Sequence, residues 1–138
     1  MSKPQDGTYY IINRVESPIG ERLCLTFTGE NQRPTVTAKS DSEAQRARWQ
    51  ITTFSDGNTQ SIVPVANTGL ECAWGPGVVV VSSAGLHVWA IRSSDSGYTI
   101  KDGSETQVWG LNLANVGSEI AIGNDAELER QRWTFHAA

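Results

Sequence analysis

Near its end the chain reads Gln131-Arg132-Trp133-Thr134-Phe135, in which a tryptophan is followed two residues later by a large apolar residue. The same Trp-x-apolar pattern occurs twice before, as Trp-Gln-Ile at 49–51 and Trp-Ala-Ile at 89–91. The three tryptophans are 40 and 44 residues apart. Residues two apart in a β-strand lie on the same face. Each copy therefore offers one tryptophan and one apolar partner to a shared interior.

Each of the three copies is preceded by further strand-like segments that match one another. The matching sets are residues 7–11, 59–63 and 96–100; residues 23–25, 72–75 and 108–111; and residues 34–36, 78–80 and 119–122. Internal repetition at this period is typical of a fold built from one repeated unit. The sequence therefore predicts a single all-β domain, residues 1–138, with three pseudo-symmetric repeats of about four strands at 6–51, 52–91 and 92–136.

The spacing of turn-forming residues is also typical of a β-protein. Short apolar runs rich in Val, Ile, Thr and aromatic residues alternate with turn dipeptides such as Asp56-Gly57 and Asp102-Gly103. The expected strands are residues 8–12, 22–27, 62–65, 77–81, 86–91, 98–100, 108–113 and 119–122. Residues 41–48 have a helical pattern, but this segment is too short for more than one or two turns.

Composition and charge exclude several classes of function. The 138 residues are 38% hydrophobic and 19% charged, with a net charge of −4 and no basic stripe, so neither nucleic acid nor an anionic membrane surface is an expected partner. No segment has the roughly 18 apolar residues of a membrane span, so direct membrane insertion is not expected. The polar residues 1–7 do not resemble a secretory signal, which predicts a cytoplasmic protein.

The chemistry-bearing residues do not form a catalytic or metal-binding pattern. The two cysteines, Cys24 and Cys72, lie in apolar runs, and two buried thiols are favoured over the alternative of one disulfide. The two histidines, His87 and His136, are far apart, and no hydrolase, redox or phosphate-loop motif is present. The carboxylates fall in charged, turn-like stretches typical of a solvated surface. We therefore expect no enzyme activity, no cofactor and no metal.

The three Trp-x-apolar copies resemble those of the ricin-type β-trefoil, whose repeats end in Gln-x-Trp. Gln131-Arg132-Trp133 matches that motif, residues 45–49 are a stretched form of it, and residues 87–89 lack the glutamine. The resemblance implies a β-trefoil in which Trp49 and Trp133 pack toward the pseudo-threefold axis.

A closer resemblance is to a small group of mushroom fruiting-body lectins. Residues 10–23 resemble their opening segment, and the likeness continues through residues 73–77, 87–89, 97–103, 109–112 and 120–123. The resemblance implies a carbohydrate-binding lectin that recognises a GlcNAc-containing glycan, an α1,3-fucosylated chitobiose, on glycoproteins or glycolipids. It further implies a defence role against animals that eat fungi. The oligomeric state is left open.

The same resemblance implies one sugar site, on the second repeat. Carried over to this chain, its residues are Trp74, Gly75, Leu86, His87, Val88 and Trp89. The family has an Asn-Tyr pair where this chain has Leu86-His87, and the preceding loop is one residue shorter here, so the glycan preferred is open.

The residue chemistry independently favours Trp74 as a sugar platform. Gly75 and Gly77 flank it, and small neighbours leave an aromatic ring free to stack on the C–H face of a pyranose. The alternative is that Trp74 belongs to the core, as we expect for Trp109.

Two other functions have less support in the sequence. Ricin-type galactose chemistry needs an Asp–Asn pair, and the nearest substitutes, Asp102 and Asn112, have the wrong spacing. A looser likeness to mushroom β-trefoil protease inhibitors leaves inhibition as the alternative function. There the loop Gly29–Pro34 would present Arg33 to a trypsin-like pocket, although Pro34 resists cleavage and a plain hairpin turn is the simpler interpretation.

Overall fold

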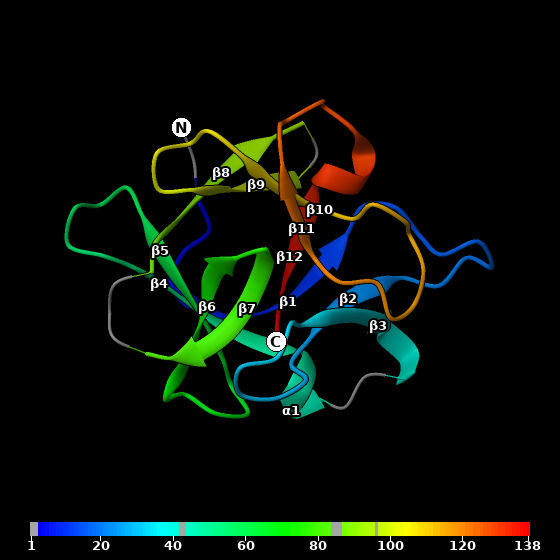
Figure 1. The fold of residues 1–138 in the computed structure, drawn as a ribbon, viewed down its shortest axis with the longest axis horizontal. Helices are drawn as coiled ribbons and strands as arrows, with labels where there is room; N and C mark the ends of the chain where they lie inside the picture. The colour runs from blue at the N-terminus through cyan, green and yellow to red at the C-terminus, as the bar shows by residue number, and fades with distance from the viewer. Residues whose placement is uncertain (1–2, 42–43, 84–86, 96) are drawn as a thin grey trace.

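The computed structural model describes residues 3–41, 44–83, 87–95 and 97–138, and these are almost entirely β-structure (Figure 1). The strands are β1 (Gly7–Asn13), β2 (Leu23–Thr26), β3 (Thr35–Ala38), β4 (Arg48–Thr53), β5 (Gln60–Pro64), β6 (Leu70–Gly75), β7 (Gly77–Ser82), β8 (Trp89–Ser94), β9 (Gly97–Asp102), β10 (Val108–Gly110), β11 (Ala121–Gly123) and β12 (Trp133–Ala137). Among the residues that the structure describes, the helical turns are η1 (Lys39–Asp41), α1 (Ala44–Ala47) and η2 (Glu129–Gln131). The all-β prediction is confirmed.

Six of the described strands close into a ring. The antiparallel pairs are β1–β4, β4–β5, β5–β8, β8–β9, β9–β12 and β12–β1. Two of these strand pairs consist of a single pair of partner residues. They are Gln60 with Trp89 between β5 and β8, and Tyr98 with Trp133 between β9 and β12. Closing the ring pairs the strand edges that would otherwise face solvent.

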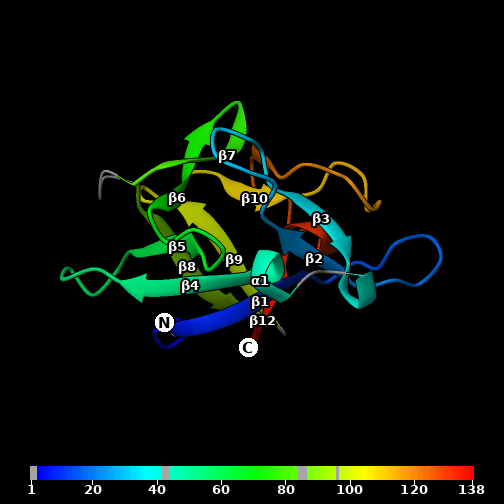
Figure 2. The ribbon, with the colours of Figure 1, turned by 90° about the horizontal axis from the view of Figure 1, so that it is seen from below.

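The other six strands form three hairpins, β2–β3, β6–β7 and β10–β11. In Figure 2, β3, β6, β7 and β10 lie on the opposite side of the molecule from the two chain ends. The hairpins also touch one another, since the amide of Val36 donates to the carbonyl of Ser118 (3.0 Å) and the amide of Val80 to the carbonyl of Gln32 (3.0 Å). A six-stranded ring capped by three hairpins is the arrangement that the β-trefoil prediction requires.

The three repeated tryptophans are buried and make the same hydrogen bond. Their exposed fractions are 0–1%, and each indole Nε1–H donates to a backbone carbonyl of the hairpin that precedes it. The bonds run from Trp49 to Leu25 (3.0 Å), from Trp89 to Cys72 (3.0 Å) and from Trp133 to Trp109 (3.2 Å). The three hairpins can therefore be aligned with one another at Leu25, Cys72 and Trp109. The sequence alone did not provide this alignment.

Some predicted strand limits are wrong. Residues 86–91 were expected to form one strand, but β8 begins at Trp89, so His87 and Val88 precede it. The reason is the turn after β9: Trp89 pairs with Asp102, beyond which the chain folds back and offers no ladder partner. The strand predicted at 108–113 ends at Gly110, because the amide of Leu111 donates to the carbonyl of Arg130 outside the ladder (3.1 Å).

The helical prediction for residues 41–48 holds only for the four residues of α1, and residues 42–43 lie outside the described residues. The strand predicted at 119–122 is β11, displaced to Ala121–Gly123.

Asp102 organises the turn between β9 and β10. Its carboxylate accepts hydrogen bonds from the amides of Thr106 (2.7 Å) and Gln107 (2.7 Å) and from the Thr106 hydroxyl (2.9 Å). Burial by itself would raise the pKa of Asp102, but these hydrogen bonds outweigh it and hold the pKa below its ordinary value. The carboxylate is thus committed to its own turn, so Asp102 is not available for galactose chemistry.

Replacing Trp133 tests how much a repeated, buried tryptophan contributes to the stability of the fold. Trp133→Ala should lower the free energy of unfolding by about 3–5 kcal/mol, because it leaves a cavity where a fully buried ring lay. Trp133→Phe keeps most of the volume but leaves the Trp109 carbonyl without its donor, so its loss should be smaller. Urea denaturation of both variants measures the loss of unfolding free energy. A Trp133→Ala variant as stable as the wild type would contradict the core role of Trp133.

The two cysteines should be free thiols that react slowly in the native protein. Cys24 and Cys72 are unpaired and buried, and burial raises the pKa of Cys24 to about 11 and raises that of Cys72 as well, which disfavours the reactive thiolate. We expect slow reaction with a thiol reagent in the native state and two thiols in denaturant without reductant. Fewer than two thiols in denaturant would indicate a disulfide.

Asp102 should make the protein sensitive to acid. Because its pKa is lower in the folded state, the stability it contributes is present above the unfolded pKa, roughly 3.9, and is lost as the pH falls through the folded value. Asp102→Asn should therefore be less stable than the wild type at pH 6, and the difference should shrink between about pH 4 and pH 2. Denaturation at several pH values measures it, and a difference that does not vary with pH would remove the charge from the explanation.

Candidate functional site

Trp74, near the end of β6, is the one tryptophan of the five that is exposed, at 45% of its surface. Its ring stacks on that of Trp89, with ring centroids 6.4 Å apart and planes 11° apart. Trp89 in turn meets the ring of Trp109 edge-on, with centroids 5.0 Å apart and planes at 83°. Two buried rings therefore support the exposed one and fix its orientation.

The tip of the β6–β7 hairpin is held close to the third hairpin. Gly75 pairs with Gly77 across Pro76. Gly77 has φ +123°, and a Cβ at this position would lie 2.8 Å from the carbonyl oxygen of Ile120. Only glycine fits this conformation and this close approach without strain. The hairpin that carries Trp74 is thus packed closely against the third hairpin at its tip.

The structure places the residues predicted for the site at different depths. Trp74 and Gly75 lie on β6, with the Trp74 ring outermost. His87 and Val88 are half-buried, and Val88 packs against the turn, since a Cβ on Gly103 would meet its Cγ2 at 2.8 Å. No hydrogen bond or ring contact of the described residues joins His87 to Trp74. Leu86 lies outside the described residues.

Trp89 lies deeper than the other residues predicted for the site. The resemblance implies a sugar contact through its ring edge or backbone, its place in the repeat implies a core role, and its ring is 1% exposed and stacked against Trp74. The reason is its hydrogen bond to Cys72, which draws the indole into the core. Trp89 therefore supports the platform instead of presenting its ring to a ligand.

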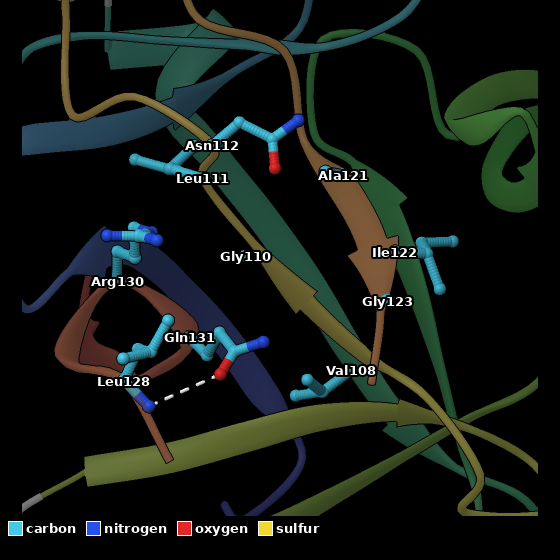
Figure 3. Close-up of a pocket in the computed structure, with 10 residues that line it drawn as sticks. All are labelled: Val108, Gly110, Leu111, Asn112, Ala121, Ile122, Gly123, Leu128, Arg130 and Gln131. Atoms are coloured by element: carbon cyan, nitrogen blue, oxygen red, sulfur yellow. Dashed lines mark hydrogen bonds between the residues drawn. The ribbon is translucent and has the colours of Figure 1, made fainter. Parts of the chain in front are cut away.

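A second feature, which sequence reasoning missed, is a hollow of about 210 Å³ beside the third hairpin (Figure 3). Arg130, Gln131 and Leu128 line one side, residues 121–123 line the other, and Gly110 lies between them.

The tryptophan hydrogen bonds relate this hollow to the Trp74 surface. Trp74 and Leu111 each follow the matched carbonyl residue by two positions, and His87 and Gln131 each precede a closing tryptophan by two. The hollow and the Trp74 surface therefore occupy matching places on two hairpins. The signal in the sequence was the glutamine of Gln131-Arg132-Trp133. The matching segments 72–75 and 108–111 do not by themselves pair Trp74 with Leu111.

The matching place on the first hairpin is covered. Phe27 stands where Trp74 and Leu111 stand, and it is 8% exposed. The guanidinium of Arg46 donates to the Phe27 carbonyl (3.2 Å) and lies 5.8 Å from the centre of its ring. Arg46 thus packs over the position that carries an exposed ring on the second hairpin.

The side chain of Gln131 holds its loop through three hydrogen bonds. Its side-chain carbonyl accepts from the amides of Ala126 (2.9 Å) and Leu128 (3.2 Å), and its amide donates to the carbonyl of Asn124 (2.8 Å). The glutamine of the motif therefore shapes the hollow through both lone pairs of its carbonyl and one of its two amide N–H groups.

The loop predicted for protease inhibition is tied down. Arg33 forms an ion pair with Glu119 (3.1 Å), and the amide of Asn31 donates to the carbonyl of Val80 (2.6 Å). These contacts join the loop to β7 and to Glu119, while residues 30–33 are exposed. Within the described residues there is also no cluster of His, Cys, Asp and Glu that could hold a metal, and no helix long and apolar enough to cross a membrane.

The fold is shared with several solved structures. The agglutinin of Rhizoctonia solani has a TM-score of 0.73 at 21% identity, covering 100% of this chain and 99% of that chain. A ricin B-like lectin of Macrolepiota procera, solved with lactose, has a TM-score of 0.71 at 16% identity, covering 100% and 99%. A designed threefold-symmetric protein, ThreeFoil, has a TM-score of 0.75 at 16% identity, covering 96% and 100%. At these identities the likeness establishes the fold, a β-trefoil.

The same fold also occurs as part of larger proteins. A mosquitocidal holotoxin matches with a TM-score of 0.81 at 13% identity, and this chain covers only 18% of it. No curated protein matches the sequence. A family model does match it, from residue 7 to residue 133, and its description is CCL2-like, CCL2 lectin-like. Because that match spans nearly the whole domain, the chain belongs to the CCL2 lectin-like family.

Proposed function

We propose that this protein is a non-catalytic lectin that binds a GlcNAc-containing glycan on the second of three trefoil repeats, with Trp74 as its stacking platform. The observation that carries the proposal is the exposed Trp74 ring, 45% accessible and stacked on buried Trp89. Membership of a lectin family and the ricin B-like neighbours support carbohydrate binding in general.

The geometry suits a pyranose for a simple reason. One face of the sugar carries C–H groups, which pack on an aromatic ring, while its rim carries hydroxyls that need polar partners. The ring of Trp74 is already oriented, so little conformational entropy is lost on binding. His87, half-buried and without a hydrogen bond among the described residues, is the polar side chain proposed for the rim.

The finer specificity is also a proposal. We infer an α1,3-fucosylated chitobiose, as on glycoproteins or glycolipids, and a role in defence of a fungus against animals that feed on it. The family resemblance supports both. Two unpaired, buried cysteines fit a reducing compartment and support a cytoplasmic location.

The alternative of protease inhibition has no structural observation in its favour, since Arg33 is paired with Glu119. A trypsin assay beside the binding assay separates the two functions, because a lectin leaves trypsin untouched.

Trp74→Ala should weaken glycan binding far more than it weakens the fold. Removing a central aromatic anchor costs about 2 kcal/mol, roughly a 30-fold rise in Kd. A monosaccharide alone should bind near millimolar, about −4 kcal/mol, so a glycan array including chitobiose with and without fucose should supply the ligand for calorimetry.

The matched control is Ile19→Ala, which removes another exposed apolar side chain, 82% accessible, from the loop between β1 and β2. It should leave Kd unchanged. Thermal melts of both variants report on the fold. Unchanged affinity in Trp74→Ala would remove Trp74 from the site, and a trypsin-inhibiting protein that binds no glycan would replace the proposed function altogether.

A further inference from the structure

The floor of the hollow beside the third hairpin is open because Gly110 carries no side chain there. A Cβ on Gly110 would lie 2.9 Å from the Cγ of Gln131 and 3.2 Å from the carbonyl oxygen of Arg130, so any larger residue would fill or distort the floor. On the far side, a Cβ on Gly123 would meet nothing within 4 Å. At about 210 Å³ the space is below the roughly 300–1,000 Å³ of drug-sized pockets, which limits an occupant to about one sugar ring.

Two polar side chains of the hollow are without hydrogen bonds in the described part of the chain. They are the amide of Asn112 and the guanidinium of Arg130, both exposed (Figure 3). The backbone of Arg130 is nevertheless fixed, because its carbonyl accepts from the amide of Leu111 (3.1 Å) and from the side-chain amide of Asn13 (3.0 Å). The guanidinium therefore extends from an anchored position.

Arg130 is also without an acidic partner among the described residues. Its neighbour Glu129 pairs with Arg14 (3.1 Å), and Asp125 pairs with Arg132 (3.1 Å). The carboxylates of Glu129 and Asp125 are thus paired with other cations. Arg130 carries the only formal charge among the residues that line the hollow.

From these features we propose that the hollow is a second ligand site, which takes a carboxylate-bearing sugar, such as a uronic or sialic acid at the end of a glycan. A guanidinium binds a carboxylate through two parallel hydrogen bonds, a geometry that a neutral sugar does not offer. The Asn112 amide can bond ring hydroxyls, and the exposed Leu128 supplies apolar surface for the C–H groups.

The two sites differ in their chemistry. No aromatic side chain lines the hollow, whereas an exposed aromatic ring forms the surface at Trp74. The second site does not depend on the proposed role of Trp74. With both sites occupied, one chain would hold two different glycan ends, and such bivalency raises avidity when the spacing allows both to bind.

The test titrates isotope-labelled protein with glucuronic acid, with N-acetylneuraminic acid and with neutral glucose, and follows backbone NMR shifts. At least one of the two acids should bind at millimolar concentration, at least tenfold more tightly than glucose, with the shifts centred on residues 108–112 and 121–131. The acid that binds more tightly identifies the class of sugar. Equal binding of glucose, no binding of either acid, or shifts centred elsewhere would overturn the proposal.

Arg130→Gln is the matching variant, since it keeps the backbone anchors and removes the charge. It should weaken acid binding at least tenfold, whereas Arg130→Lys should recover only part of it because a lysine cannot form the paired bonds. Trp74→Ala should not change acid binding, which separates failure here from failure of the proposed glycan site. Full acid binding by a folded Arg130→Gln variant would overturn the proposal.

Discussion

Three buried indole N–H groups, those of Trp49, Trp89 and Trp133, each join a ring strand to the hairpin before it through one backbone carbonyl. A buried polar group left without a partner costs roughly 1–3 kcal/mol, so each indole strongly favours this one position of its hairpin. The ring closes through narrow junctions such as that of Gln60 with Trp89, and the hairpins then meet on one side of it. Both candidate sites lie on hairpins held in this way.

The same tryptophans also determine what the surface can do. Because Trp89 is drawn inward by its bond to Cys72, its ring becomes the support on which Trp74 stacks. On the third hairpin the equivalent outward position is Leu111, which is buried, and the space beside it stays open because Gly110 carries no side chain. One backbone framework thus carries an aromatic platform in one place and a hollow with a free guanidinium in another.

The matching positions of the three hairpins carry different residues, and two of the three side chains are buried in the core. Phe27, Trp74 and Leu111 occupy matching positions, yet one is covered by Arg46, one is exposed and one borders a hollow. A framework fixed by buried hydrogen bonds and closed pairing tolerates this variation. Different surface chemistry on each hairpin is therefore compatible with one fold.

The sequence by itself determined the all-β class and the buried tryptophans, because a Trp-x-apolar pattern places both side chains on one face of a strand. It also singled out Trp74, since its glycine neighbours are visible in the sequence. Tertiary structure alone decided the burial of Trp89 and the hollow beside Arg130. Both depend on register between segments distant in the chain, and that register is set by hydrogen bonds to backbone carbonyls, which every residue possesses and no sequence pattern marks.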